Sequence, residues 1–117
     1  MPHLIVDYST TLDDRADMQA LLKRLHDVAC TLPTIDPHSV KSRLSPRSHA
    51  LVGQAGPDAL YAHVQFSLLN GRTLAVRQQM RDELAAILTD ILPSATDLAV
   101  EIRQMEKDTY FKQAGVA

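Results

Sequence analysis

The hydrophobic pattern in the first third of the chain changes from that of a strand to that of a helix and back. Residues 4–8 are apolar and partly β-branched, which is typical of a strand covered on at least one face. Apolar residues then recur every three or four positions, which predicts one stripe along a helix; they are Met18, Leu21, Leu22, Leu25, Val28, Ala29 and Leu32. We expect Thr11, with Asp14 three residues later, to cap this helix and Pro33 to end it. Alternation over residues 39–46 predicts a second extended segment.

The second half of the chain repeats this order of patterns. Residues 60–69 alternate between apolar and mixed positions, which predicts a strand, and residues 70–73 have the composition of a turn and a helix cap. The helix that follows carries one apolar stripe, formed by Val76, Met80, Leu84, Ile87, Leu88 and Ile91. Pro93 ends that helix, and residues 98–103 are expected to form the fourth strand. The glycines, proline and small polar residues of 47–59 predict a loop between the halves.

Strand, helix and strand therefore occur twice, and the two halves align at an offset of about 60 residues that places Pro33 opposite Pro93. The first repeat spans about 2–46 and the second about 60–105, with a C-terminal tail over 106–117. A helical crossover favours parallel pairing of the two strands in each unit. We therefore expect an α+β fold of tandem duplicated βαβ units, with a four-stranded sheet and two helices on one face. The other face then needs a partner, and further copies of the subunit are the simplest one.

Composition limits both the fold and the partners. The chain has 117 residues, 45% of them apolar, which suits a single domain over residues 1–117. One cysteine and no cleavable leader predict a cytoplasmic protein without disulfides. The apolar runs are too short to span a membrane. The 12 basic and 14 acidic residues are interspersed, so we expect no nucleic-acid partner, and a small anionic substrate must be held by a few placed cations.

Several motifs, taken in order, resemble those of a known family. Proline directly follows the initiator methionine, a Gly-Arg-Thr turn lies at the mouth of the second helix, and the tail contains Phe-Lys-Gln. Over nearly its whole length the chain resembles the tautomerase superfamily, and within it the 5-carboxymethyl-2-hydroxymuconate Δ-isomerases. The matching motifs are Pro2-His3, Gly71-Arg72-Thr73-Leu74, Arg77-Gln78-Gln79 and Phe111-Lys112-Gln113. This resemblance implies a homotrimer in which three sheets close into a barrel, and an isomerase that uses no cofactor.

Pro2 is the residue from which the chemistry would start. Removal of Met1 leaves a free secondary amine, and a neighbouring cation or a dry pocket lowers the pKa of such an amine from its ordinary value of about 8. A base with a pKa near 7 is what enolisation requires. Proline is also a common second residue, so it gains meaning only together with the duplicated unit and Arg72. With Met1 attached, the nitrogen is an amide and cannot act as a base.

Three cations are candidates for binding the substrate. Arg72 lies where a strand ends and a helix begins, so its guanidinium can bind a carboxylate through two hydrogen bonds; a solvated surface arginine is the alternative. Lys41 and Arg43 are two residues apart and share one face of a strand. The resembled isomerases have Arg-Ser-Arg there, and lysine lacks the planar fork of arginine. Charges that prevent pairing at an edge strand would explain Lys41 and Arg43 equally well.

The remaining candidates are weaker. Phe111 matches, by the resemblance, an active-site phenylalanine that keeps the proline neutral, and it could also pack at a subunit contact. The five histidines show no metal-ligand spacing with cysteine or carboxylates, so no metal is expected. His3 is interpreted as a satisfied histidine and Cys30 as a packed small hydrophobic residue.

Taken together, the residues and the resemblance favour a cofactor-independent isomerase of a small polyanionic 2-hydroxymuconate-type acid from aromatic degradation. Pro2 is the expected base, and Arg72, Lys41 and Arg43 bind the dienolate beside the apolar wall of Phe111. Two alternatives stay open. One is a tautomerase of another substrate, such as a phenylpyruvate-like enol. The other is a trimeric binding protein without catalytic activity, in which the proline has no role.

Overall fold

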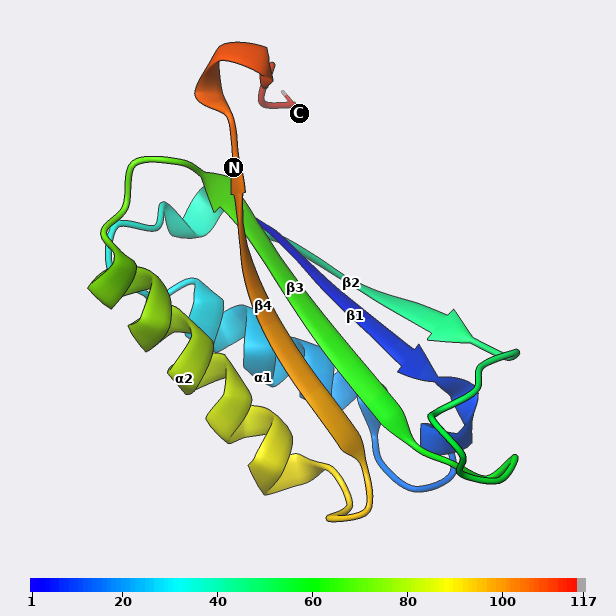
Figure 1. Cartoon of the computed structure of the whole chain (residues 1–117). Helices are drawn as coiled ribbons and strands as arrows, with labels where there is room; N and C mark the ends of the chain where they lie inside the picture. Colours follow the sequence, from blue (N-terminus) through cyan, green and yellow to red (C-terminus); the bar gives the residue numbers. More distant parts are fainter. Residues whose placement is uncertain (116–117) are drawn as a thin grey trace.

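The computed structural model describes residues 1–115; the last two residues of the expected tail, 116–117, lie outside the described part. Strands and helices follow the predicted order (Figure 1). They are β1 (His3–Ser9), α1 (Met18–Ala29), β2 (Lys41–Arg47), β3 (Tyr61–Leu69), α2 (Leu74–Ile91) and β4 (Asp97–Met105). Short 3-10 turns are formed by Thr10–Leu12, Pro37–Ser39 and Lys107–Thr109. In the described part of the chain, no helix combines the length and the apolarity that crossing a membrane requires.

The four strands form one sheet in the order β2-β1-β3-β4. β1 pairs in parallel with β2, and β3 with β4, whereas the two central strands run antiparallel. Each βαβ unit is therefore a parallel pair, as its helical crossover predicted, and the α+β fold is confirmed. Lys41 N donates to the carbonyl of Pro2 at 3.0 Å, just before the first pair. At the opposite end of the sheet, Asp97 N donates to the carbonyl of Leu60 at 2.8 Å.

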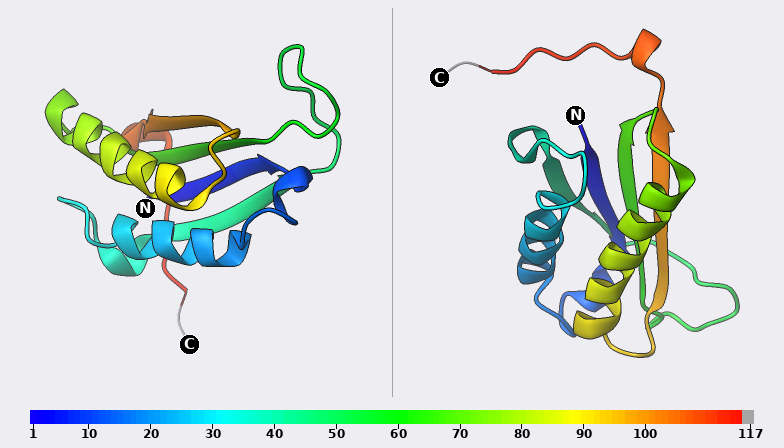
Figure 2. Two further views of the ribbon diagram at one scale, coloured as in Figure 1. Left: turned by 90° about the horizontal axis from the view of Figure 1, so that it is seen from below. Right: turned by 90° about the vertical axis from the view of Figure 1, so that its left-hand side faces the viewer.

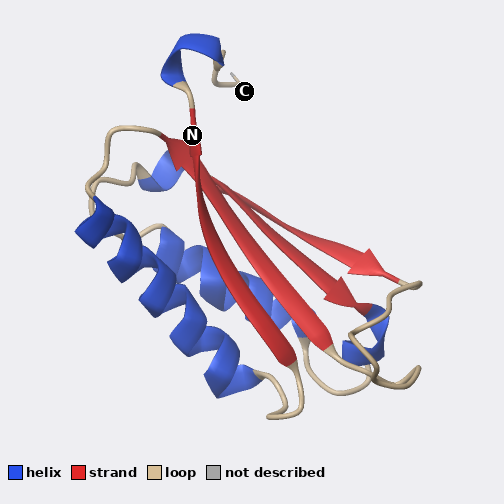
Figure 3. Ribbon diagram, in the orientation of Figure 1, coloured by secondary structure: helices blue, strands red, loops and turns tan. Residues whose placement is uncertain are grey.

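Both helices lie on the same face of the sheet (Figures 2 and 3). Their predicted apolar stripes form one hydrophobic core with alternate residues of the two central strands. The fully buried core includes Leu4, Val6, Leu21, Leu25, Val64, Phe66, Met80 and Leu84. Burial of each such side chain stabilises the fold by about 1.5–3 kcal/mol, so this layer accounts for the one-sided arrangement.

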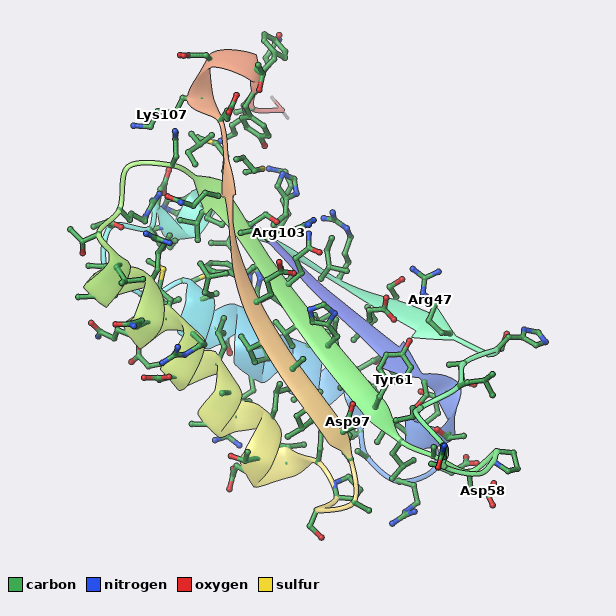
Figure 4. The ribbon with its side chains drawn as sticks, viewed as in Figure 1. Arg47, Asp58, Tyr61, Asp97, Arg103 and Lys107 are labelled. Carbon is green, nitrogen blue, oxygen red and sulfur yellow. The ribbon has the colours of Figure 1, made fainter. Side chains whose placement is uncertain are left out.

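The face of the sheet that the helices leave uncovered is polar. Tyr61 OH donates to Asp7 Oδ1 at 2.6 Å, and Arg47 Nε lies 3.5 Å from the same oxygen. Further along the sheet, Arg103 Nε lies 3.2 Å from Glu101. Figure 4 shows Arg47 and Tyr61 toward one end of the sheet and Arg103 toward the other. The expected need for a covering partner therefore concerns a charged surface rather than a second apolar layer.

The first helix begins later than its pattern suggested. The expected cap at Thr11 is wrong, because α1 begins at Met18. Asp17 caps it by accepting a hydrogen bond from Ala20 N at 3.0 Å. Thr11 Oγ1 instead donates to the carbonyl of Ala59 at 2.8 Å. Thr11 thus belongs to the separate 3-10 turn Thr10–Leu12, and this contact with a distant part of the chain holds it there.

The second helix begins as predicted. Thr73 caps α2, with its hydroxyl accepting a hydrogen bond from Val76 N at 3.2 Å. Gly71, two residues earlier, has φ of 121°, a conformation that L side chains rarely adopt. The turn between β3 and α2 therefore has a defined shape, which fixes the backbone position of Arg72.

Candidate active site

A pocket of about 440 Å³ lies at the end of the sheet where β1 begins and β3 ends. Five segments line it: the start of the chain, the connection into β2, the end of β3, the turn before α2 and the 3-10 turn after β4. Its residues include Met1, Pro2, Thr34, Asp36, Arg72 and Lys107. Two residues that the sequence singled out independently, Pro2 and Arg72, therefore line the same cavity.

The amino terminus is held in place by hydrogen bonds. Met1 N donates to Ser39 Oγ at 3.2 Å, and the buried Pro2 accepts a backbone hydrogen bond from Lys41. The first bond ties the chain start to the 3-10 turn Pro37–Ser39 and the second ties it to β2. Pro2, one residue inside the present terminus, is therefore held where it lines the pocket.

The electrostatics of this corner favour a neutral amine. Burial lowers the pKa of the Met1 amino group from its ordinary 8.0, and the positive charges of Lys112, Lys41 and Arg72 lower this pKa further. Asp36 acts in the opposite direction and raises the pKa. Because the burial and the three cations outweigh the one acid, an amine placed here is a better base near neutral pH than an exposed one.

Arg72 is oriented by the protein itself. Its Nε and Nη2 donate to the hydroxyl and the carbonyl of Thr34, at 2.7 and 3.0 Å. Its Nη1 donates to the carbonyl of Leu69 at 2.9 Å. A guanidinium has five N–H donors, so two remain for a ligand. The pKa of Arg72 is lowered by burial, and the side chain stays a cation because a guanidinium ionises far above neutral pH.

Lys41 and Arg43 share one face of β2, as predicted, but that face is the uncovered side of the sheet. Within residues 1–115 neither side chain lines the pocket. Arg43 Nη1 lies 3.3 Å from His3 Nδ1, and His3 Nε2 lies 2.9 Å from Tyr110 OH. Because arginine only donates, His3 Nδ1 accepts and Nε2 donates to the phenol oxygen. Burial, Arg43, Lys41 and the amino terminus lower the pKa of His3, which favours this neutral form.

Phe111 does not wall the pocket within one chain. Its side chain is 83% exposed, and the tail that carries it extends away from the sheet (Figure 2). The structure therefore brings Pro2 and Arg72 together and leaves Lys41, Arg43 and Phe111 outside the cavity of the same chain. No group of three or more His, Cys, Asp or Glu side chains among residues 1–115 is placed to hold a metal ion.

The sequence reasoning missed several pocket residues, among them Thr34, Asp36 and Lys107. One of them left a usable signal. The parallel pairing of β3 with β4 places the ends of both strands at the same edge of the sheet. Lys107, the second residue after β4, must therefore lie near the turn that carries Arg72.

Known structures share this fold. A 5-carboxymethyl-2-hydroxymuconate delta-isomerase has a TM-score of 0.86 at 21% identity, with 98% of this chain and 89% of that chain covered. A 5-carboxymethyl-2-hydroxymuconate isomerase from Deinococcus radiodurans R1 has a TM-score of 0.86 at 25% identity, covering 97% and 90%. A fused 4-OT described as a wild-type symmetric trimer has a TM-score of 0.76 at 21% identity, covering 98% and 94%.

Comparison of the sequence with known families agrees with the structural similarity. No curated protein sequence matches the chain. A family model described as 5-carboxymethyl-2-hydroxymuconate isomerase matches it over residues 2–117, which is nearly its whole length. The protein therefore belongs to the 5-carboxymethyl-2-hydroxymuconate isomerase family, within the tautomerase superfamily.

Proposed function

We propose that the protein is a cofactor-independent isomerase that moves a proton, and with it a double bond, in a small 2-hydroxymuconate-type acid. The base is the secondary amine that Pro2 gains when Met1 is removed. One observation carries the proposal: the start of the chain and Arg72 line the same pocket. The family supports isomerase chemistry, and the products of aromatic ring cleavage supply substrates of this class.

The proton transfer has two steps. The neutral amine of Pro2 takes a proton from the 2-hydroxy group or from an allylic carbon of the substrate, which leaves a dienolate and a prolinium. The two free N–H donors of Arg72 stabilise the charge of the dienolate or of its carboxylate. The prolinium then returns the proton at the vinylogous carbon, so the double bond shifts and the amine is regenerated.

The surroundings of the amine support this role. The groups that lower the pKa of the Met1 amine also surround Pro2, which is one residue further along the chain. Loss of Met1 also vacates the part of the pocket that this residue lines. Retained Met1 has two consequences in this mechanism: it converts the base into an amide, and it takes up space that the substrate needs.

The working unit is a homotrimer in this proposal. The uncovered sheet face and the exposed Phe111 both lack a partner within the described part of one chain, and the fused 4-OT of similar fold is a trimer. In such an assembly Lys41, Arg43 and Phe111 act in sites completed by neighbouring chains. Light scattering should report three times the chain mass of 12.9 kDa, and a stable monomer would contradict this arrangement.

A substrate with fewer carboxylates, such as a phenylpyruvate-like enol, is the second candidate. It is favoured by the position of Lys41 and Arg43 outside the pocket of their own chain, which leaves Arg72 with fewer cationic neighbours there. A panel of 2-hydroxydienoates and phenylpyruvate enol, followed by ultraviolet absorbance, distinguishes the two. The preferred substrate is the one with the highest kcat/KM.

The state of the chain start provides the decisive test. The mass of the purified protein shows whether Met1 is absent. Isomerase activity should be present in chains that begin at Pro2 and absent in chains expressed with the methionine aminopeptidase inhibited. Pro2→Ala, which supplies a primary amine, should be impaired but active. Full activity with Met1 demonstrably attached would exclude Pro2 as the base and leave a binding role for the pocket.

A further inference from the structure

Lys107 is a pocket cation with no role in the mechanism above. It follows β4 at the end of the sheet where the chain begins (Figure 4), and it lines the same cavity as Arg72. Its Nζ lies 3.2 Å from the position that a Cβ on Gly71 would take. The ammonium group therefore lies against the backbone of Gly71, the residue before Arg72.

Neither of these two cations is neutralised by an acid within residues 1–115. The ion pairs of this part of the chain, with N–O distances up to 4.0 Å, involve other side chains. Arg72 keeps two N–H donors after its bonds to Thr34 and Leu69, and Lys107 has three ammonium donors. Two unpaired cations on one wall attract an anionic ligand and gain from its binding.

The shape and the remaining charge of the cavity limit that ligand. A volume of about 440 Å³ is within the range of small-molecule sites and accommodates an extended six-carbon diacid. Asp36 lines the same cavity and disfavours a further carboxylate beside it. The two cations therefore favour an acid with two carboxylates over one with a single carboxylate, whereas Asp36 disfavours a third.

We propose that Lys107 is a specificity-determining residue that binds the second carboxylate of the substrate, while Arg72 binds the first. This inference rests on the proposed function, because it assigns a residue to the far carboxylate of the 2-hydroxymuconate-type acid proposed above. Gly71 contributes by having no side chain, because a Cβ there would press against the Lys107 ammonium.

The test compares two unreactive ligands of the same carbon skeleton. Muconate is a six-carbon dienoate with two carboxylates, and sorbate is the matching dienoate with one. Calorimetry on the intact protein should show tighter binding of muconate. Lys107→Gln should weaken muconate binding about three- to tenfold and leave sorbate binding unchanged, because Lys107 is solvent-exposed and its ion pair is partly screened. Lys107→Arg should keep the muconate preference.

The controls separate this inference from the isomerase proposal. Lys23→Gln removes an exposed cation that pairs with Asp27 on α1, away from the pocket, and should leave both affinities unchanged. Circular dichroism checks that each variant is folded. A muconate affinity that Lys107→Gln does not change, an equal loss for both ligands, or no preference in the parent protein would overturn the inference. Since neither ligand carries a hydroxyl or keto group to isomerise, the binding result stands even where no turnover is found.

Discussion

Arg72 donates hydrogen bonds to both the hydroxyl and the carbonyl of Thr34, a residue 38 positions earlier in the chain. Thr34 has φ of 67°, which is a rare conformation for a β-branched residue. The backbone of the connection into β2 is therefore held in a strained form opposite the guanidinium. One interaction shapes two walls of the pocket, because it orients Arg72 and fixes the segment that leads to Asp36.

Replacement of Arg72 by alanine should affect binding and turnover together. Loss of a charge-assisted hydrogen bond to the substrate costs about 1.5–3 kcal/mol, which lowers kcat/KM about tenfold to more than a hundredfold. Steady-state kinetics on the best dienol substrate measures this loss. Arg72→Lys keeps the charge but not the planar fork, so its kcat/KM should lie between those of the parent protein and the alanine variant. Unchanged kcat/KM in the alanine variant would remove Arg72 from the substrate site.

Thr34 offers a matched pair of substitutions. Thr34→Ser keeps the hydroxyl that accepts the bond from Arg72 Nε, so activity should be close to that of the parent protein. Thr34→Val keeps the branched shape and removes the acceptor, so the guanidinium loses part of its orientation. We expect KM to rise several-fold, by about the value of one hydrogen bond, in the valine variant only. Equal kinetics for the two variants would show that the bond does not orient Arg72.

The pH dependence of kcat/KM should respond to the charges around the amine in opposite directions. Lys112 lowers the pKa of the amino group, so Lys112→Gln should move the ascending limb to higher pH. Asp36 raises this pKa, so Asp36→Asn should move the limb to lower pH. Rate profiles of the two variants and the parent protein measure both shifts. Shifts in the same direction are incompatible with an amine as the titrating base.

Stability should fall in alkaline solution through the half-buried phenol of Tyr61. Burial, followed by the hydrogen bond to Asp7, raises the pKa of Tyr61 from 10.0 to about 12. Below pH 10 the phenol is protonated in both the folded and the unfolded chain; between about 10 and 12 only the unfolded chain ionises, so the free energy of unfolding decreases. Urea unfolding at about pH 9 and 11 measures the decrease. The Tyr61→Phe variant should show a smaller decrease in the free energy of unfolding. An equally large decrease in this variant would mean that other groups cause it.

Most of the fold could be predicted from the sequence, because each helix and strand has its own local pattern of apolar residues. The stripe that includes Met80, Leu84 and Leu88 defines one helix face, and the helical crossovers determine the parallel pairs. The start of α1 could not be predicted, because residues 10–12 form a separate 3-10 turn in which Thr11 bonds to the carbonyl of Ala59, 48 residues away. No local pattern contains such a contact.

The candidate site could be predicted only in part. Pro2 lies just before β1, and Arg72 lies shortly after β3. Because these two strands are antiparallel neighbours, the sheet brings the two residues together. Lys41 and Arg43 share a strand face as the alternation required, but which face of the sheet borders the pocket is decided by the packing of both helices. The strain at Thr34 and the orientation of Arg72 exist only once these segments meet.

The matching hydrogen bonds at the two ends of the sheet have a consequence for how many reaction sites a duplicated chain can hold. Leu60 occupies in the second unit the position that Pro2 occupies in the first, and each carbonyl accepts from the first residue of the paired strand. The nitrogen of Leu60 is a peptide amide, joined through Ala59 to the preceding unit, and no processing of the chain start can free it. Tandem joining of two βαβ units thus leaves two similar corners with unequal chemistry: one where an amine can arise, and one that can serve only as structure.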